Sequence, residues 1–346
     1  MIKLTQGDIL KAQTEALVNT VNCVGIMGRG IALQFRKAFP DNFKAYKQVC
    51  DRKQLHPGEV FVYDLGRLEP PRLVINFPTK RHWKGKSKLE DIQTGLEALV
   101  REIRVRGIRS VAVPPLGCGL GGLDWDVVRP LIEEAFASLP EVYIEVYEPK
   151  GAPEAQAMVD HTEAPDMTPG RAALLGLMRR YLGGLMDTSV SLLEIHKLMY
   201  FLQETGEPLR LDYAKAPYGP YARNLRHVLI RIEGHYVTGY GDAEDKPDRK
   251  IELKPEASDM AEGYLKQHED TRKRLDRVGN LIAGFETPYG MELLSTVHWV
   301  ATREGAQTQD EVLDRTYEWG EQKKMFKPEH VQIAWRVLKD KGWLNT

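Results

Sequence analysis

A loop with three glycines separates two regular patterns near the start of the 346-residue chain. The apolar run at 16–22 is typical of a buried strand, and a helical pattern at 31–39 follows the loop and ends before Pro40. Glycines at a strand-to-helix turn let backbone N–H groups surround an anion, and the helix N-terminus adds partial positive charge. The stretch Gly25–Ala32 therefore predicts a phosphate site. The alternative is a turn that only packs a helix against a sheet.

The first 150 residues alternate between strand-like and helical patterns. The strand-like runs are 59–63, 73–77, 110–113 and 142–146, and the helical ones are 89–105 and 126–138. This order predicts a layered α/β domain with helices on both faces of a sheet. A second glycine-rich loop, Pro114–Gly122, follows the run at 110–113. Two such loops at the carboxyl end of a sheet would hold a diphosphate from both sides.

Several short motifs accompany the two glycine loops. They are Gly7-Asp8-Ile9, the pair Asn19 and Asn22, and Asn76-Phe77-Pro78-Thr79-Lys80 followed by Trp83. In this order they resemble the macrodomain family over residues 1–149. The segment from Asn76 is similar to the branch of terminal ADP-ribose glycohydrolases, and most similar to the DarG antitoxins, which are DNA ADP-ribosyl glycohydrolases paired with DarT toxins. The resemblance implies a three-layer α/β/α domain with a mixed sheet, which removes ADP-ribose from thymidine in single-stranded DNA.

The resemblance also implies a set of ADP-ribose-binding residues. They are Asp8, Ile9, Asn19, Met27, Gly28, Gly30, Ile31, Ala32, Thr79, Gly117, Cys118, Gly119, Leu120 and Gly121. Within this set Asp8 would accept a hydrogen bond from the adenine amine, and the glycines would hold the diphosphate. A carboxylate at the place of Asp8 can instead cap a following turn.

Lys80 and Asn22 are the catalytic pair that the resemblance implies, with Asn22 orienting the distal ribose. A desolvated lysine beside a phosphate site can attack the anomeric carbon or the ring-opened aldehyde, transfer protons, or stabilise charge on the leaving base. Outside that context a lysine after a strand is a solvated charge. Related human-type enzymes carry an aspartate in the second glycine loop, where this chain has Gly121-Gly122.

The loop after Lys80 is rich in cations. Arg81, Lys84 and Lys86 would meet DNA phosphates, and Trp83 would offer a stacking face to a base. A basic loop without specificity is the alternative. No Cys/His cluster has the spacing of a zinc site, so we expect neither a metal nor a cofactor.

The second half of the chain has a mostly helical pattern, unlike the alternating strands and helices of the first half. A Pro-, Ala- and Glu-rich linker is expected at 150–170, followed by a mostly helical domain at 171–346. The predicted helices are 171–186, 191–205, a long region at 259–285, 292–304, 309–317 and 328–341. The segment from His196 to Leu202 with Tyr218-Gly219-Pro220-Tyr221 resembles the helical domains of antitoxins related to SocA.

Three roles stay open for this second half. Residues 1–150 carry 22 Lys+Arg against 18 Asp+Glu, whereas 151–346 carry 26 against 31. An acidic helical surface suits the DNA-binding face of a toxin, so binding of a DarT-type ADP-ribosyltransferase is favoured over DNA binding. A winged-helix-like end near Trp335 and Trp343 would favour DNA, and a structural appendage is the third reading.

Composition bounds the remaining possibilities. The chain has no apolar run that could span a bilayer and no signal-peptide pattern, and its three cysteines suggest no disulfide framework. We therefore expect a cytoplasmic protein, and the resemblance implies a hydrolase that binds ADP-ribose and acts as an antitoxin. The alternatives are a non-catalytic ADP-ribose reader and a hydrolase of protein-linked ADP-ribose or O-acetyl-ADP-ribose.

Overall fold

The computed structural model describes residues 1–184 and 187–344. It divides into two compact units, Met1–Glu163 and Ala164–Thr346. The boundary lies inside the segment 150–170 that the sequence predicts to be a linker. On the side of the first unit, Asp160 forms an ion pair with Lys37 at 3.0 Å, and the backbone N–H of His161 donates to the Lys37 carbonyl. On the side of the second unit, the Tyr236 hydroxyl donates to the Pro165 carbonyl.

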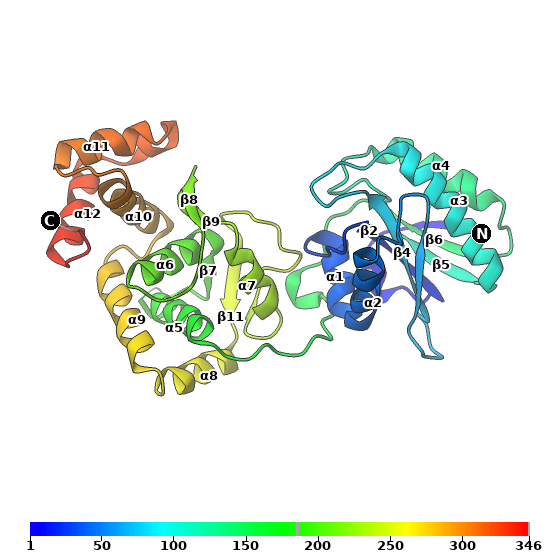
Figure 1. The fold of residues 1–346 in the computed structure, drawn as a ribbon, viewed down its shortest axis with the longest axis horizontal. Helices are drawn as coiled ribbons and strands as arrows, with labels where there is room; N and C mark the ends of the chain where they lie inside the picture. Colours follow the sequence, from blue (N-terminus) through cyan, green and yellow to red (C-terminus); the bar gives the residue numbers. More distant parts are fainter. Residues whose placement is uncertain (185–186, 345–346) are drawn as a thin grey trace. The chain divides into compact units, whose positions relative to one another are not determined.

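A six-stranded sheet forms the centre of the first unit, with strand order β1-β6-β5-β2-β4-β3 (Figure 1). The strands are β1 (Ile2–Thr5), β2 (Ala16–Asn22), β3 (Phe61–Asp64), β4 (Leu73–Lys80), β5 (Ser110–Val113) and β6 (Tyr143–Tyr147). The helices are η1 (Ile9–Lys11), α1 (Gly30–Ala38), α2 (Pro40–Asp51), α3 (Leu89–Arg106), α4 (Trp125–Ala137) and η2 (Ala155–Ala157). All neighbouring strands are parallel except β3, which is antiparallel to β4. The predicted α/β/α architecture with a mixed sheet is confirmed.

Alternate residues of the central strands pack on opposite faces of this sheet. Val18 and Phe77 belong to a buried cluster with α3 and α4, whereas Leu17 and Val74 pack with Phe35 of α1. A strand turns successive side chains to opposite faces, so strands covered on both sides are apolar throughout. Hydrophobic burial on both faces thus fixes the sheet, and with it the loops at its carboxyl edge.

The start of α2 is the main local difference from the sequence prediction. The sequence indicates only that Pro40 stops the helix at 31–39. In the structure α1 ends at Ala38, and Pro40 opens the next helix at its first position. Proline fits there because the first N–H groups of a helix have no intrahelical partner. The short edge strand β1 is a second element that the sequence patterns did not indicate.

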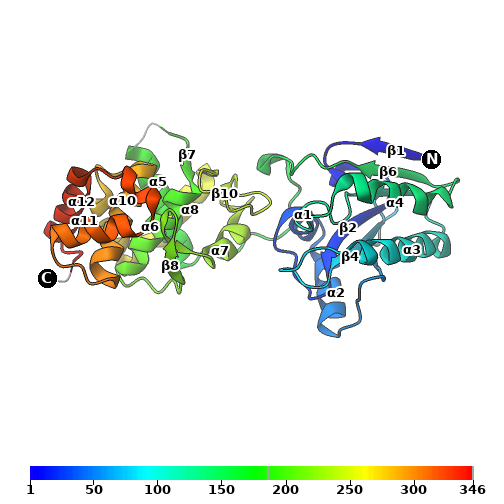
Figure 2. The same ribbon diagram turned by 90° about the horizontal axis from the view of Figure 1, so that it is seen from above.

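The second unit is mostly helical, with two small sheets, β10-β11-β7 and β8-β9. Its helices are α5 (Pro169–Gly184), α6 (Leu192–Glu204), α7 (Leu225–Ile232), α8 (Pro255–Leu265), α9 (Glu269–Ile282), α10 (Pro288–Arg303), α11 (Gln309–Glu318), η3 (Glu321–Met325) and α12 (Pro328–Asp340). Its strands are β7 (Ser189–Ser191), β8 (Tyr213–Ala216), β9 (Gly219–Ala222), β10 (Val237–Thr238) and β11 (Lys250–Leu253). Figure 2 shows α10, α11 and α12 packed together at the end of this unit.

Three expectations for this unit are refined by the structure. The predicted end of the first helix, Met186, lies outside the described residues. The long region at 259–285 forms two helices, because the chain turns between Leu265 and Glu269. No strand follows Leu253 in the part described up to residue 344, so the hairpin of a winged-helix unit is not formed there. The short strands of this unit escaped prediction because none has a clear alternation of apolar and polar residues.

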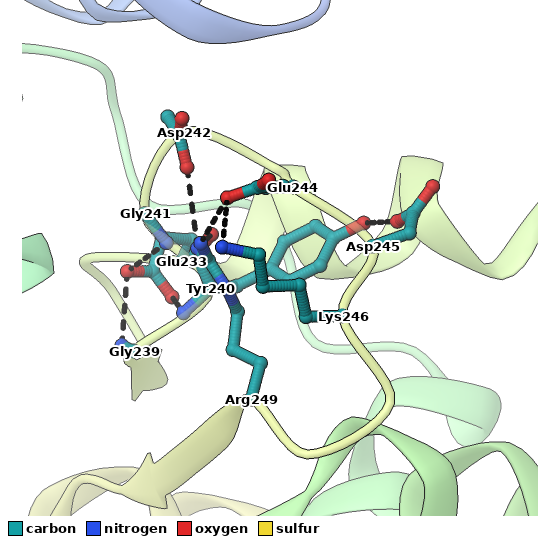
Figure 3. Close-up of polar contacts among 9 residues, drawn as sticks. All are labelled: Glu233, Gly239, Tyr240, Gly241, Asp242, Glu244, Asp245, Lys246 and Arg249. Atoms are coloured by element: carbon teal, nitrogen blue, oxygen red, sulfur yellow. Dashed lines mark hydrogen bonds and ion pairs between the residues drawn. The ribbon is translucent and has the colours of Figure 1, made fainter. Parts of the chain in front are cut away.

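A buried carboxylate organises the loop between β10 and β11 (Figure 3). Glu233, directly after α7, accepts hydrogen bonds from the backbone N–H groups of Gly239, Tyr240 and Gly241 at 2.9–3.1 Å. Arg249 donates to the Tyr240 carbonyl at 2.5 Å and pairs with Asp242 at 3.2 Å. The carboxylate replaces the regular backbone partners that this irregular segment lacks.

Candidate active site

Three neighbouring parallel strands, β5, β2 and β4, place the candidate site at their carboxyl ends. Asn22 ends β2 and lies opposite Lys80, the last residue of β4, in the strand register. The first glycine loop continues from β2, and the second continues from β5. The open edge of a parallel sheet is the usual location of a ligand site in α/β proteins. The structure therefore brings Lys80, Asn22 and both glycine loops together, as the sequence predicts.

The Asn22 side chain holds the first glycine loop in shape. Its Oδ1 accepts hydrogen bonds from the backbone N–H groups of Val24 at 3.0 Å and Ile26 at 3.3 Å, and its Nδ2 donates to the Ile26 carbonyl at 2.5 Å. Tyr46 supports it from below, because the phenol donates to the Asn22 backbone carbonyl at 2.6 Å. Among the described residues, the second N–H of this amide has no acceptor. The main structural role of the Asn22 side chain is therefore to position the first glycine loop.

The first loop leads directly into α1. Gly30 is the first residue of the helix and has a φ of 57°, a conformation that favours glycine. Ile31 and Ala32 complete the first turn, whose N–H groups have no intrahelical acceptor. Gly28 is half-buried, and a Cβ added there would meet only Ile26, at 3.7 Å. These donors and the helix dipole favour an anion at this point.

The second glycine loop presents three free donors. Among the described residues, the backbone N–H groups of Gly119, Leu120 and Gly121 form no hydrogen bond. A Cβ on Gly121 would lie 2.2 Å from the Gly117 carbonyl oxygen, so the tight turn requires glycine there. A Cβ on Gly30 would lie 3.5 Å from Cδ1 of Leu120, so the two glycine loops face each other. Adjacent N–H groups of this kind form an anion-binding concavity.

Lys80 reaches from the end of β4 to the second loop. Its Nζ donates to the Leu120 carbonyl, and the side chain is half-buried. Burial lowers the pKa of Lys80, because removing the amine from water disfavours the charged form. Burial also raises the pKa of the Cys118 thiol to about 11, which disfavours the nucleophilic thiolate. Lys80 thus lies where a ligand held by the loops would meet an amine that loses its proton more readily than usual.

The two oxygens of the Asp8 carboxylate have different surroundings. One oxygen, Oδ1, accepts the backbone N–H of Leu10 at 3.0 Å and caps η1. The other, Oδ2, is buried and has no partner among the described residues. A buried carboxylate oxygen without a donor is costly, so it favours a ligand that brings one. Neighbouring Ile9 is buried in the core and packs beneath this turn.

Comparison with known proteins identifies the family. The Macro domain family matches residues 18–132. A DNA ADP-ribosyl glycohydrolase of Thermus aquaticus is 45% identical over 345 residues, covering 100% of this chain and 95% of the relative. This chain belongs to the DNA ADP-ribosyl glycohydrolase family.

Two further relatives match less than half of this chain. The solved structure of the macrodomain of Mycobacterium tuberculosis DarG is 53% identical, covers 43% of this chain and 99% of that chain, and has a TM-score of 0.43. A fusion protein of Thermosipho africanus, named DNA ADP-ribosyl transferase-DNA ADP-ribosyl glycohydrolase, is 35% identical over 172 residues. That match covers 45% of this chain and 44% of the fusion protein.

Three of the expected ligand residues of this glycohydrolase are buried in its core. Asn19 is fully buried, and its Nδ2 donates to Oδ1 of Asn76 at 3.0 Å and lies 3.8 Å from the sulfur of Met27. Met27 is itself buried, and the Thr79 hydroxyl donates to the Val21 carbonyl at 3.5 Å. In this structure these side chains support the two strands beneath the site.

Sequence reasoning missed two residues of this supporting layer. Asn42 of α2 accepts a hydrogen bond from Nδ2 of Asn76 at 2.7 Å, and Tyr46 bonds Asn22. Both lie on a helix that the sequence patterns did not reveal, so no local signal marked them. An amide at position 76, inside an otherwise apolar strand, is the one available hint, because a buried amide needs a polar partner.

The cations in the basic loop of the glycohydrolase differ in whether they form ion pairs. Arg81 pairs with Asp91 at 2.9 Å and also approaches Glu90 at 3.4 Å. Trp83 is 47% exposed, and the Lys84 amine lies 5.0 Å from its ring centroid. Lys86 is exposed and forms no ion pair among the described residues. All four side chains are accessible, and Arg81 differs from Lys84 and Lys86 in that its charge is paired.

Residues 1–184 and 187–344 contain neither a candidate metal site nor a membrane-spanning helix. No group of three His, Cys, Asp or Glu side chains there could hold a metal ion. None of the helices is long and apolar enough to cross a membrane.

Proposed function

We propose that the first unit hydrolyses the bond between ADP-ribose and thymidine in single-stranded DNA. The observation that carries the proposal is the contact of the Lys80 amine with the second glycine loop, whose consecutive N–H groups at 119–121 form no hydrogen bond among the described residues. The diphosphate would bind these donors, and Oδ2 of Asp8 would accept the adenine amine. In this arrangement the distal ribose would lie towards the end of β4.

Hydrolysis breaks the bond between the anomeric carbon of the distal ribose and a thymine ring nitrogen. Water supplies a hydroxyl to the carbon and a proton to the nitrogen. Lys80 assists by attacking the sugar carbon or by moving the proton, and burial favours both because it increases the share of neutral amine. The remaining N–H of Asn22 would orient the ribose.

The exposed part of the basic loop would bind the DNA strand that carries the modified base. The amines of Lys84 and Lys86 suit phosphates, and Trp83 offers a face on which a flanking base can stack. We do not assign this role to Arg81, because its guanidinium is held by Asp91.

The decisive test incubates the full-length protein with a thymidine-ADP-ribosylated single-stranded oligonucleotide. Release of free ADP-ribose and unmodified DNA is the expected result. Protein-linked ADP-ribose and O-acetyl-ADP-ribose are offered in parallel, and preferred cleavage of either would replace DNA as the substrate. Binding of ADP-ribose without any cleavage would make the protein a reader.

We further propose that the second unit binds and neutralises a DarT-type toxin. The fusion protein of Thermosipho africanus combines, by its name, a transferase and a glycohydrolase, which supports a functional pairing. The acidic balance of residues 151–346 suits the basic groove of a DNA-modifying toxin. A Lys80→Ala protein that still protects cells from the toxin would support neutralisation by binding. Complete loss of protection in that variant would assign the antitoxin effect to hydrolysis alone.

A further inference from the structure

Ser87 joins the basic loop to the second glycine loop. Its backbone N–H donates to the Gly121 carbonyl at 3.0 Å, and at the other end of the same segment the Lys80 amine donates to the Leu120 carbonyl. Two consecutive carbonyls of the glycine loop are thus held by the two ends of the segment 80–87. A peptide N–H points away from the carbonyl of the same peptide unit. The Leu120 carbonyl therefore directs the Gly121 N–H away from Lys80.

The hydroxyl of Ser87 lies inside this loop without a partner. The residue is 8% exposed, and its buried Oγ has no hydrogen-bond partner among the described residues. A Cβ built on Gly121 would lie 2.3 Å from this oxygen, and one on Gly117 would lie 3.1 Å from it. Both glycines therefore allow the hydroxyl to enter the turn that carries the free N–H groups.

A buried hydroxyl without an acceptor is unfavourable, and a folded protein normally satisfies such a group. An anion bound by the N–H groups of Gly119, Leu120 and Gly121 would provide the missing acceptor at the same turn. A hydrogen bond to a charged acceptor is stronger than one to a neutral acceptor.

We propose that Ser87 is a binding residue for the diphosphate of ADP-ribose, its hydroxyl donating to a phosphate oxygen held by the second glycine loop. The proposal rests on the ADP-ribose site of the proposed function and adds a side-chain ligand to it. The hydrogen bond from the Ser87 backbone N–H to the Gly121 carbonyl keeps the basic loop beside the diphosphate. The same residue therefore links the part that would bind DNA to the part that would bind ADP-ribose.

The test compares Ser87→Ala with the wild-type full-length protein in calorimetric titrations with ADP-ribose and with ADP. We expect affinity for both ligands to fall by about tenfold to a hundredfold, because one charge-assisted hydrogen bond is lost. The thermal midpoint of the ligand-free protein should not fall, since the substitution removes an unsatisfied group. A loss restricted to ADP-ribose would contradict the assignment to the diphosphate.

Ser110→Ala serves as the matched control. The Ser110 oxygen accepts the backbone N–H of Glu15 at 2.8 Å, at the opposite end of β5, and so has a structural partner. This variant should lose thermal stability and keep its affinity for both ligands. A Ser87→Ala protein that behaves in the same way would overturn the proposal. Failure of the wild-type protein to bind ADP-ribose would refute the proposed function instead, so the two failures are distinguishable.

Discussion

Two lysines with lowered pKa values occupy very different surroundings in the two units. Lys80 lies at the end of a strand, half-buried, with its amine at the edge of an open glycine loop. Lys197 of α6 is completely enclosed and donates to the Pro220 carbonyl at 2.7 Å. Burial is the largest cause of both shifts, and it lowers the pKa of Lys197 to about 7.

The difference lies in what surrounds each amine. Around Lys80, backbone donors have no partner and a ligand can be held. Around Lys197 the neighbours are already engaged: Lys323 pairs with Glu292, and the Thr296 hydroxyl donates to the Glu292 backbone carbonyl at 2.7 Å. A lowered pKa therefore reports burial in both units, and the unsatisfied donors around an accessible amine distinguish Lys80 as the candidate for catalysis.

The largest expected effect is the loss of hydrolysis in Lys80→Ala. Removing the amine should lower the rate of ADP-ribose release from DNA by about a thousandfold or more, because a nucleophile or proton-transfer group contributes on that scale. Affinity for free ADP-ribose should change only a few fold, since the loops supply the diphosphate contacts. Single-turnover kinetics and calorimetry measure the two quantities.

Lys197→Met is the control that tests the comparison itself. Its amine is enclosed in the second unit and donates to the Pro220 carbonyl, so hydrolysis should stay at the wild-type level. Equal loss of activity in the two variants would mean that the contrast between the lysines is wrong.

The second effect concerns the glycine that the tight turn requires. Gly121→Ala should weaken ADP-ribose binding by about a hundredfold, because the new Cβ would overlap the Gly117 carbonyl and the Ser87 hydroxyl. Gly119→Ala is the matched control, as a Cβ there meets nothing within 4 Å. Similar affinities for the two variants would show that the loop is not rigid.

These contrasts also show which parts of the site could be predicted from the sequence. The glycine loops, Lys80 and Asn22 were predictable, because strand periodicity, turn residues and a family resemblance all locate them at one sheet edge. The engagement of Arg81 by Asp91 was not, since it depends on where α3 begins relative to the loop. The burial of Asn19 and Met27 was also hidden, because a resemblance between sequences does not tell a ligand contact from its support.

The residues that support the site from α2 were not predicted, for a related reason. Tyr46 and Asn42 belong to α2, whose start at Pro40 has the appearance of a helix end in the sequence. Long-range hydrogen bonds such as the one from Tyr46 to Asn22 are determined by packing and leave no local pattern. In the second unit, the polar cluster around Lys197 arises from α6, α10 and η3 together.

A third and smaller effect separates DNA binding from ADP-ribose binding. The double variant Lys84→Glu, Lys86→Glu should bind ADP-ribosylated DNA about tenfold more weakly at low salt, because charges that meet phosphates become repulsive. Free ADP-ribose should bind as before. The exposed Lys53, at the end of α2, supplies the control substitution Lys53→Glu. Equal losses for DNA-linked and free ADP-ribose would remove the basic loop from DNA recognition.

The smallest effect is a pH-dependent stability difference due to Lys197. The folded-state pKa of about 7 lies below the ordinary value of 10.5, so between these values the unfolded chain binds the additional proton. Stability from this group therefore rises as the pH increases above 7. Between pH 7 and pH 8 the wild-type protein should gain about 1 kcal/mol in unfolding free energy relative to Lys197→Met. Urea denaturation of both proteins at the two pH values measures this difference.

The other titratable groups contribute equally to the pH dependence of the unfolding free energy in both proteins, so their contributions cancel in the difference. Methionine keeps most of the volume of the lysine side chain and carries no proton, so the difference isolates the buried amine. A stability difference that does not change between pH 7 and pH 8 would mean that Lys197 keeps an ordinary pKa despite its burial. The ion pair of Lys323 with Glu292 would then have to compensate a second buried positive charge.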